Sequence, residues 1–287
     1  MPTSHGHWAP VMHDRHRERR YAHICCNQKV RRRLLMLTDP WFYAVAIPAV
    51  ILTGLSKGGF LGGIGGVAVP LMSLVISPVQ AAAIMLPILI AMDWTGVWAY
   101  RRDWSAPNLK ILLPAATLGI LIGWQTAAYV TDAHVKLLVG LIGFAFALDW
   151  WLGLRPKTTA PGPNVAKGSL FGGISGFTSF VSHTGGPPYA VYMLPQHLPN
   201  AIYAGTAVMF FTAVNLIKVP AYLQLGQFTA TNLKTALVLA VPGMLAVMTG
   251  IWLTRKIAQE PFYKVVYGCL LLISAKLMWD GARALMT

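Results

Sequence analysis

The fold of this chain is decided by one glycine-rich stretch, Gly54-Leu-Ser-Lys-Gly-Gly-Phe-Leu-Gly-Gly-Ile-Gly-Gly-Val-Ala-Val-Pro70. It lies inside a long apolar run, and glycine at this density beside a proline predicts unwound backbone. At membrane depth, unwound backbone is stable only where protein or a water-filled cavity satisfies its hydrogen bonds. The stretch therefore predicts a broken helix that lines the interior of a membrane protein. The alternative is close helix packing through small residues.

The composition around this stretch indicates the same class of protein. Apolar residues make up 55% of the 287 residues, charged residues make up 11%, and the mean hydropathy is +0.55. A soluble domain carries about a quarter charged residues, and so few charges cannot cover a surface in water. We therefore expect an all-α fold, a polytopic bundle of transmembrane helices in a lipid bilayer.

Apolar runs separated by short polar breaks give the expected helices. Most are close to the ~20 residues that a helix needs to cross the hydrocarbon core. The runs are 41–76, 79–100, 111–130, 135–154, 168–194, 201–223, 235–254 and 262–282. Residues 41–76 and 168–194 are interrupted by glycine, proline and serine, and both are too long for an ordinary crossing.

The second half of the chain repeats the first. Phe60, Gly65 and Gly66 correspond in order to Phe180, Gly185 and Gly186, and Asn108-Leu-Lys110 recurs as Asn232-Leu-Lys234. Each match is weak by itself, but their common order indicates a duplication. The expected parts are a first repeat over 36–154, a cytoplasmic linker over 155–167 and a second repeat over 168–287.

Two topologies fit the interrupted runs. If each run crosses once as a broken helix, there are about eight crossings in two parallel four-helix repeats, and with a cytoplasmic N terminus most basic loops lie inside. If each run is a two-pass hairpin, the arrangement is an inverted five plus five, and the basic loops at 101–110 and 155–167 fall outside. We favour the eight crossings on this ground.

Residues 1–35 differ from the rest and form an expected disordered or misassigned extension, with Met36 as an alternative start. The scattered histidines of this segment could bind metal, but a disordered tail explains them more simply. Eight of the 23 Lys/Arg precede residue 40, and most others lie in short loops, so the net charge of +14 indicates membrane topology and no nucleic-acid partner. The sequence leaves a homo-oligomer open.

Both broken segments offer groups that can bind an anion, namely free backbone N–H groups, helix N-termini and hydroxyls. In the first segment the expected binding residues are Lys57, Gly58, Gly59, Gly62, Gly63, Gly65 and Gly66. In the second segment they are Thr178, Ser179, Ser182, His183, Thr184, Gly185 and Gly186. Asn215 adds a polar group at the corresponding depth of the run 201–223. His183 bonded to a backbone carbonyl is the purely structural alternative.

Three ionisable residues lie in or near the apolar runs. Lys57 can place a cation near an anionic substrate. Asp93 lies in the middle of the run 79–100, so we name it, with His183, as a proton-coupling candidate. Lys218 lies late in the run 201–223, and we expect it to extend to the cytoplasmic interface.

Catalytic and cofactor motifs are absent from the sequence. It contains no HExxH or Walker pattern, and we expect no metal, no cofactor and no catalytic residues. A membrane enzyme that uses Ser182 and His183 is the alternative, but no acidic residue lies near them in sequence to orient the base.

At the glycine segments the sequence resembles the TauE/SafE family of sulfite and organosulfonate exporters. The resemblance rests on Gly58–Pro70, on Gly176-Phe-Thr-Ser-Phe-Val-Ser-His-Thr-Gly-Gly-Pro-Pro188 and on Phe210-Phe-Thr-Ala-Val-Asn-Leu-Ile-Lys-Val-Pro220, and it covers about residues 36–287. It implies a bacterial inner-membrane location and two related four-helix halves. It also implies secondary transport, by alternating access, of a small sulfur-containing anion such as sulfite or sulfoacetate. Transport of another small anion, in either direction, remains the alternative.

Overall fold

Long apolar helices form nearly all of the described chain in the computed structural model. It describes residues 39–60, 68–72, 75–126, 132–152 and 162–286, and from Pro40 onward these belong to one compact unit. Within these ranges every regular element is helical, as the apolar runs predict. Since a bilayer offers no partner for backbone N–H and C=O groups, helices satisfy them internally.

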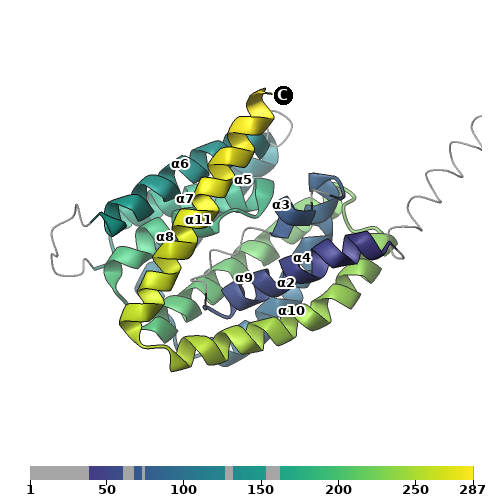
Figure 1. Cartoon of the computed structure of the whole chain (residues 1–287). Coiled ribbons are helices and arrows are strands. Elements are labelled where there is room, and N and C mark those ends of the chain that lie inside the picture. Colours follow the sequence, from purple (N-terminus) through teal and green to yellow (C-terminus); the bar gives the residue numbers. More distant parts are fainter. Residues whose placement is uncertain (1–38, 61–67, 73–74, 127–131, 153–161, 287) are drawn as a thin grey trace, which may run out of the picture. The chain divides into compact units, whose positions relative to one another are not determined.

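The helices follow the predicted runs closely (Figure 1). Their bounds are α2 Pro40–Lys57, α3 Ala68–Met72, α4 Pro78–Tyr100, α5 Ala106–Thr126, α6 Asp132–Trp151, α7 Val165–Ser182, α8 Gly186–Met193, the 3-10 turn η1 Leu194–Gln196, α9 Asn200–Gln224, α10 Ala230–Lys256 and α11 Gln259–Met286. Side-chain caps begin three of them, from Ser77 before α4, Asn164 before α7 and Thr229 before α10. In the described part, α2, α4, α5, α9, α10 and α11 are long and apolar enough to cross a membrane.

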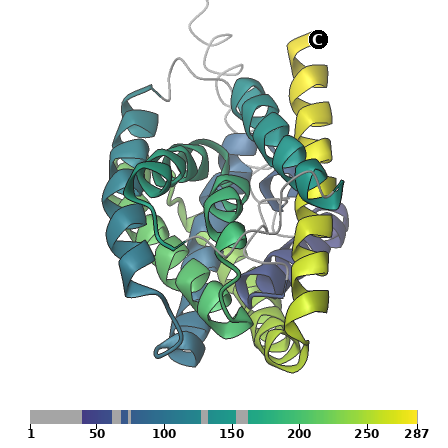
Figure 2. The same cartoon turned by 90° about the vertical axis from the view of Figure 1, so that its left-hand side faces the viewer.

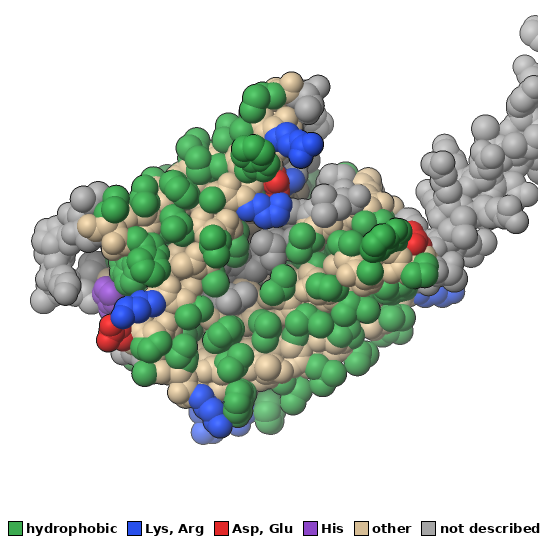
Figure 3. Space-filling view, in the orientation of Figure 1, with side chains coloured by type: hydrophobic (Ala, Val, Ile, Leu, Met, Phe, Trp, Pro, Cys, Tyr) green, Lys and Arg blue, Asp and Glu red, His purple; other side chains and the backbone are tan. Residues whose placement is uncertain are grey.

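The outer surface of these helices is apolar. Leu237, Leu245, Met248 and Trp252 of α10 are each more than half exposed. Hydrophobic side chains cover the face made by α2, α10 and α11, with few charged side chains between them (Figure 3). An exposed apolar face of this extent marks contact with other apolar matter, here the lipid.

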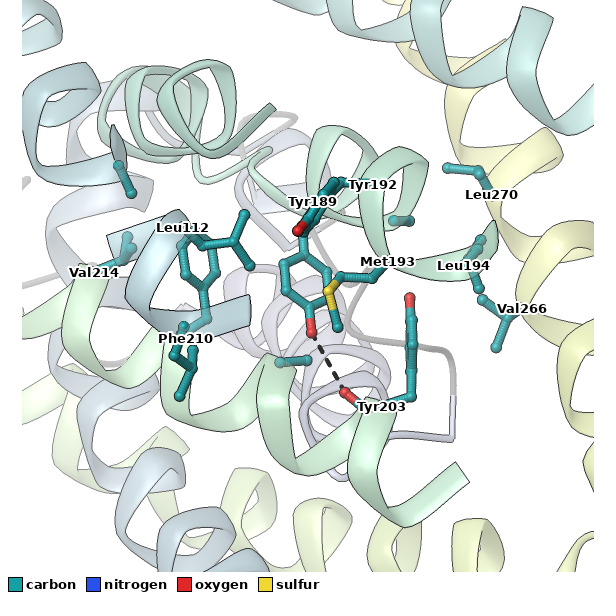
Figure 4. Packing of buried hydrophobic residues seen from close by; sticks show 14 of the residues in the cluster. Leu112, Tyr189, Tyr192, Met193, Leu194, Tyr203, Phe210, Val214, Val266 and Leu270 are labelled. Carbon is teal, nitrogen blue, oxygen red and sulfur yellow. Dashed lines mark hydrogen bonds between the residues drawn. The ribbon is translucent and has the colours of Figure 1, made fainter. Parts of the chain in front are cut away.

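Two apolar clusters hold the helices together. One joins α5, α8, α9 and α11 through aromatic side chains, and the other joins α2, α3, α4 and α10. In the first, Tyr189 of α8 lies against Phe210 of α9 with ring centroids 5.4 Å apart, and its hydroxyl donates to the carbonyl of Tyr203 at 3.4 Å (Figure 4). α11, the yellow helix seen lengthwise in Figure 2, also packs along α6.

The second interrupted run is a hairpin, so the prediction of a single broken crossing is wrong there. Gly185 lies against Ser175, and the Ser175 hydroxyl donates to its carbonyl at 2.7 Å. Further on, the Tyr192 ring lies beside Gly168, and its hydroxyl accepts from the backbone N–H of Asn164 at 3.3 Å. α8 therefore runs back along α7 toward the end at which α7 begins.

The chain between α2 and α4 also turns back. Near the end of α10, Thr254 donates to the carbonyl of Gly58 at 3.4 Å. Near the start of α10, Asn232 accepts from the Gln80 side chain at 3.3 Å. Between residues 58 and 80 the chain therefore returns along the length of α10, which a single crossing cannot do. Gly62, Gly63, Gly65 and Gly66, predicted as binding residues, lie outside the described residues.

Glycines fix how closely the two hairpins pack. A Cβ on Gly58 would lie 2.4 Å from the carbonyl oxygen of Val247 on α10, and one on Gly176 would lie 2.1 Å from that of Ala116 on α5. Both distances are far inside van der Waals contact, so only glycine allows these approaches. α2 is thereby fixed along α10, and α7 along α5. The close-packing alternative thus accounts for Gly58 and Gly176.

Candidate functional site

A small cavity lies where α2 and the α7–α8 hairpin meet α4 and α9. Its volume is about 50 Å³, which is room for a few water molecules or one small ion. Its lining combines polar and apolar side chains. The lining residues are Thr53, Ser56, Lys57, Leu89, Ser179, His183, Gly186, Ala207, Val208, Phe211 and Asn215.

One residue that lines this cavity, Lys57, belongs to an ion pair. Lys57, the last residue of α2, pairs with Asp93 of α4, and the other carboxylate oxygen of Asp93 accepts from the Asn215 side chain of α9 at 2.9 Å. Asp93 and Asn215 are only 4% and 2% exposed. Three helices are thus joined at membrane depth by one carboxylate, whose charge is compensated by the Lys57 ammonium. Whether Asp93 couples protons stays a prediction.

Lys218 forms a second polar centre directly behind the cavity wall. It is completely buried, so the expectation that it extends to the interface is wrong. Its ammonium donates to the carbonyl and the hydroxyl of Ser179, both at 3.1 Å, and lies 3.0 Å from Nδ1 of His183. Nε2 of His183 lies 3.3 Å from the Tyr222 hydroxyl. His183 also makes a hydrogen bond to the backbone of Ala82, so the purely structural alternative, a bond to a backbone carbonyl, holds beside these side-chain contacts.

The turn between α7 and α8 holds His183 in place. His183 has a φ of 54°, a left-handed conformation, and its N–H closes the end of α7 on the Ser179 carbonyl at 3.2 Å. α8 then starts at Gly186, and Pro187 and Pro188 are its next two residues. Because proline has no backbone N–H, these positions leave no donor unpaired in the first turn. The positive end of α8 and Gly186 consequently face the cavity.

Several predicted binding residues stabilise the hairpin instead of lining the cavity. The Ser182 hydroxyl lies 2.7 Å from that of Thr184, and Thr178 donates within α7 to the carbonyl of Ile174 at 2.8 Å. Gly185 packs against Ser175. Of the residues predicted from the sequence, the structure brings Lys57, Ser179, His183, Gly186 and Asn215 together around the cavity.

The described glycines of the first segment also have packing roles. Gly58 accepts from the Tyr100 hydroxyl at 2.7 Å, and Gly59 has a φ of 97°, which favours glycine. Neither lines the cavity.

Ser56 is a site residue that sequence reasoning missed. Its hydroxyl lines the cavity, is 1% exposed and has no hydrogen-bond partner among the described residues. A buried hydroxyl without a partner costs about 1–3 kcal/mol, so it indicates a group that binds there in another state. Only its place beside Lys57 could have suggested this from the sequence.

The charges around the cavity favour an anion. Lys57 is balanced by Asp93, whereas the described contacts of Lys218, to Ser179 and His183, include no carboxylate. The described site thus has more positive than negative charge, in surroundings where water screens it little. No hydrogen-bonded serine–histidine pair occurs among the described residues of the hairpin, because Ser182 bonds Thr184 and His183 bonds Lys218 and Tyr222.

Comparison with known proteins agrees with this arrangement. The profile of the family described as sulfite exporter TauE/SafE matches residues 46–277, which include the cavity and both hairpins. No curated protein and no solved structure matches the chain. Because the family profile spans most of the sequence, the chain belongs to the TauE/SafE family of membrane transporters.

Proposed function

We propose that this protein is a secondary transporter that exports a small sulfur-containing anion, either sulfite or an organosulfonate such as sulfoacetate. The family is described as sulfite exporters, which supports the substrate class and the direction. The observation that carries the proposal is the buried cavity itself. It combines Lys57, the unpartnered Ser56 hydroxyl and the start of α8 in a site with surplus positive charge.

The substrate oxygens would bind between the two hairpins. The Ser56 hydroxyl and the Lys57 ammonium would donate from α2, and the backbone N–H of Gly186, the first residue of α8, would donate from the other side. Leu89, Val208 and Phe211 would exclude water and contact the apolar part of an organosulfonate. Charge-assisted hydrogen bonds to an oxyanion are roughly twice as strong as neutral ones, which favours an anion over a neutral solute.

We further propose alternating access by two inverted halves, α2–α6 and α7–α11, each consisting of a hairpin and three long helices. This replaces the parallel eight-crossing arrangement. Helix contacts in the two halves correspond, since α2 packs parallel to α10 and α7 packs parallel to α5. α4 corresponds to α9 and α6 corresponds to α11 in the two halves. The two helices of each such pair pack against each other in antiparallel directions, as an inverted repeat requires. The cavity then lies at the interface of the halves, where a rocking motion would expose it to either side.

The repeated asparagines support the same relation. Asn108, in the first turn of α5, donates to the Gln196 side chain at 2.9 Å, and Gln196 follows the hairpin of the other half. Asn232, in the first turn of α10, accepts from Gln80, which follows the first hairpin. In each half, therefore, an asparagine forms a hydrogen bond with the glutamine that follows the hairpin of the other half.

We place the protein in the bacterial inner membrane. For its orientation, two groups of basic residues compete under the positive-inside rule. Eight Lys/Arg precede residue 40 and favour the cytoplasmic N terminus that we propose. The opposite end, where α4 meets α5, carries Arg101, Arg102 and Lys110, with Arg255 and Lys256 from α10. Labelling at Ser105 from either side of the membrane decides between the two orientations.

Flux from loaded vesicles tests the proposed function. Purified protein in liposomes should release sulfite or an organosulfonate, and a Lys57→Ala and Ser56→Ala double variant with unchanged insertion should not. A Lys264→Ala variant is the matched control, because Lys264 pairs with Glu260 on the exposed face of α11. Normal flux in the double variant would remove the proposed anion site, and no flux of any sulfur anion by the unaltered protein would remove the proposed function.

A further inference from the structure

The charges at the site can be counted residue by residue. Within the described part of the cavity and its immediate shell, the ionisable side chains are Lys57, Asp93, Lys218, His183 and Tyr222. Lys57 and Asp93 form an ion pair and cancel. The net charge therefore depends on Lys218, His183 and Tyr222.

The surroundings of Lys218 can accommodate an ammonium. An ammonium has three N–H donors, and Lys218 has three acceptors within 3.1 Å, the carbonyl and hydroxyl of Ser179 and Nδ1 of His183. With Lys218 as an ammonium, Nδ1 accepts from it, and the neutral imidazole carries its proton on Nε2, with the Tyr222 hydroxyl 3.3 Å away and a backbone hydrogen bond to Ala82 as a further contact of the ring. The phenol is uncharged, so the site as a whole has a charge of plus one.

A buried ammonium whose partners are all neutral costs free energy, because it has lost water and gained no counter-ion. An anion in the cavity supplies that counter-charge. A single negative charge brings the site to neutrality, whereas two charges leave an uncompensated negative charge at membrane depth. We propose that the cavity selects monovalent anions, and that Asp93 determines this selectivity by already neutralising Lys57.

This inference rests on the proposed function and narrows its substrate. Hydrogen sulfite and monosulfonates carry one charge and fit the site. The sulfite dianion, and sulfoacetate with its additional carboxylate, carry two charges and fit it poorly. The cavity volume of about 50 Å³ also favours a small sulfonate over one with a long charged arm.

Methanesulfonate and sulfate are a matched pair of probes. Both are tetrahedral and similar in size, and at neutral pH they carry one and two negative charges. Equilibrium binding to the purified full chain and flux in liposomes would be measured for each anion at one pH. We expect the unaltered protein to prefer methanesulfonate by at least about tenfold, the order expected for one unit charge near a partly screened site.

Two variants separate charge from packing. Asp93→Asn raises the charge of the site to plus two, so sulfate should gain at least about tenfold relative to methanesulfonate. The double variant Lys57→Met and Asp93→Asn restores a charge of plus one, so the preference for methanesulfonate should return. If Asp93→Asn does not fold, Asn215→Asp is the reverse test, since an added carboxylate should weaken binding of both anions.

The outcomes distinguish this inference from the proposed function. Equal binding of sulfate and methanesulfonate by the unaltered protein would overturn the inference while leaving anion transport in place. An unchanged ratio in a folded Asp93→Asn variant would also overturn it. If the unaltered protein neither binds nor moves any of these anions, sulfite included, the proposed function fails and the inference fails with it.

Discussion

The side-chain nitrogen of Lys218 lies 3.0 Å from Nδ1 of His183, which joins the last third of α9 to the turn of the α7–α8 hairpin. Lys218 lies within α9, whereas His183 is held by the turn that ends α7. Movement of the hairpin against α9 would have to break this contact. Replacing a residue of this pair therefore tests its role in stability and in anion binding.

Replacing Lys218 should separate stability from binding. In Lys218→Met the buried charge is lost, and since buried charges without a counter-ion destabilise a fold, the thermal midpoint of the anion-free protein should stay the same or rise. Methanesulfonate binding should weaken by about 3 kcal/mol, or roughly 100-fold. Lys234→Met, at an exposed position, is the control. A variant that unfolds but binds normally when folded would contradict this role.

Removing the Ser56 hydroxyl should affect binding alone. Because it has no partner in the described structure, Ser56→Ala should leave the free energy of unfolding of the anion-free protein unchanged or raise it, while anion affinity falls by about 1.5–3 kcal/mol. Ser274→Ala is a matched control, since the Ser274 hydroxyl is also buried without a partner but lies between α6 and α11, away from the cavity. Equal effects of the two substitutions on anion binding would refute a site at Ser56.

The contact between α2 and α10 should tolerate no added methyl group. A Cβ on Gly250 would lie 2.5 Å from the carbonyl oxygen of Leu55, so Gly250→Ala should destabilise the protein by about 1–3 kcal/mol. Gly162→Ala should be close to neutral, because nothing lies within 4 Å of its Cβ position. Thermal unfolding in detergent would measure both. A stable Gly250→Ala variant would show that the two helices can separate at low cost.

Labelling of single cysteines tests the inverted arrangement. In a chain without Cys25, Cys26 and Cys269, cysteines at Gly162 and Leu225 should react from opposite sides of the membrane. Eight single crossings would place the two positions on the same side, because one crossing pair separates them. An impermeant maleimide applied to sealed vesicles, with and without lysis, gives the result. Labelling of both from one side would refute the hairpins.

Much of the fold was predictable because it depends on composition and run length. The apolar runs give the helices, and the glycine segments give the positions where helices end near the cavity. Lys57, Ser179, His183 and Asn215 were predicted as site residues because polar groups are costly at membrane depth, and all four line the cavity.

The hairpins were not predictable in the same way. The length of a run such as 168–194 fits either one broken crossing or a hairpin that returns to the same side. The positive-inside rule favoured a crossing, but it depends on the charges of the loops and does not report whether the chain reverses within a run. The contact between Tyr192 and Asn164 decides it. Lys218 was assigned to the interface because it lies near the end of its apolar run. Its acceptors, on Ser179 and His183, come from another helix and cannot be read from the neighbouring sequence.

The glycine contacts between α2 and α10 also have a consequence for biosynthesis. Thr254 and Gly58, which meet in the folded protein, are 196 residues apart in the chain, whereas α7 finds its partner α5 among helices already inserted. A chain released from the ribosome from its N terminus onward therefore completes the second hairpin first. The first hairpin remains without its partner helix until α10 enters the membrane, so the nascent protein depends most on assistance during that interval.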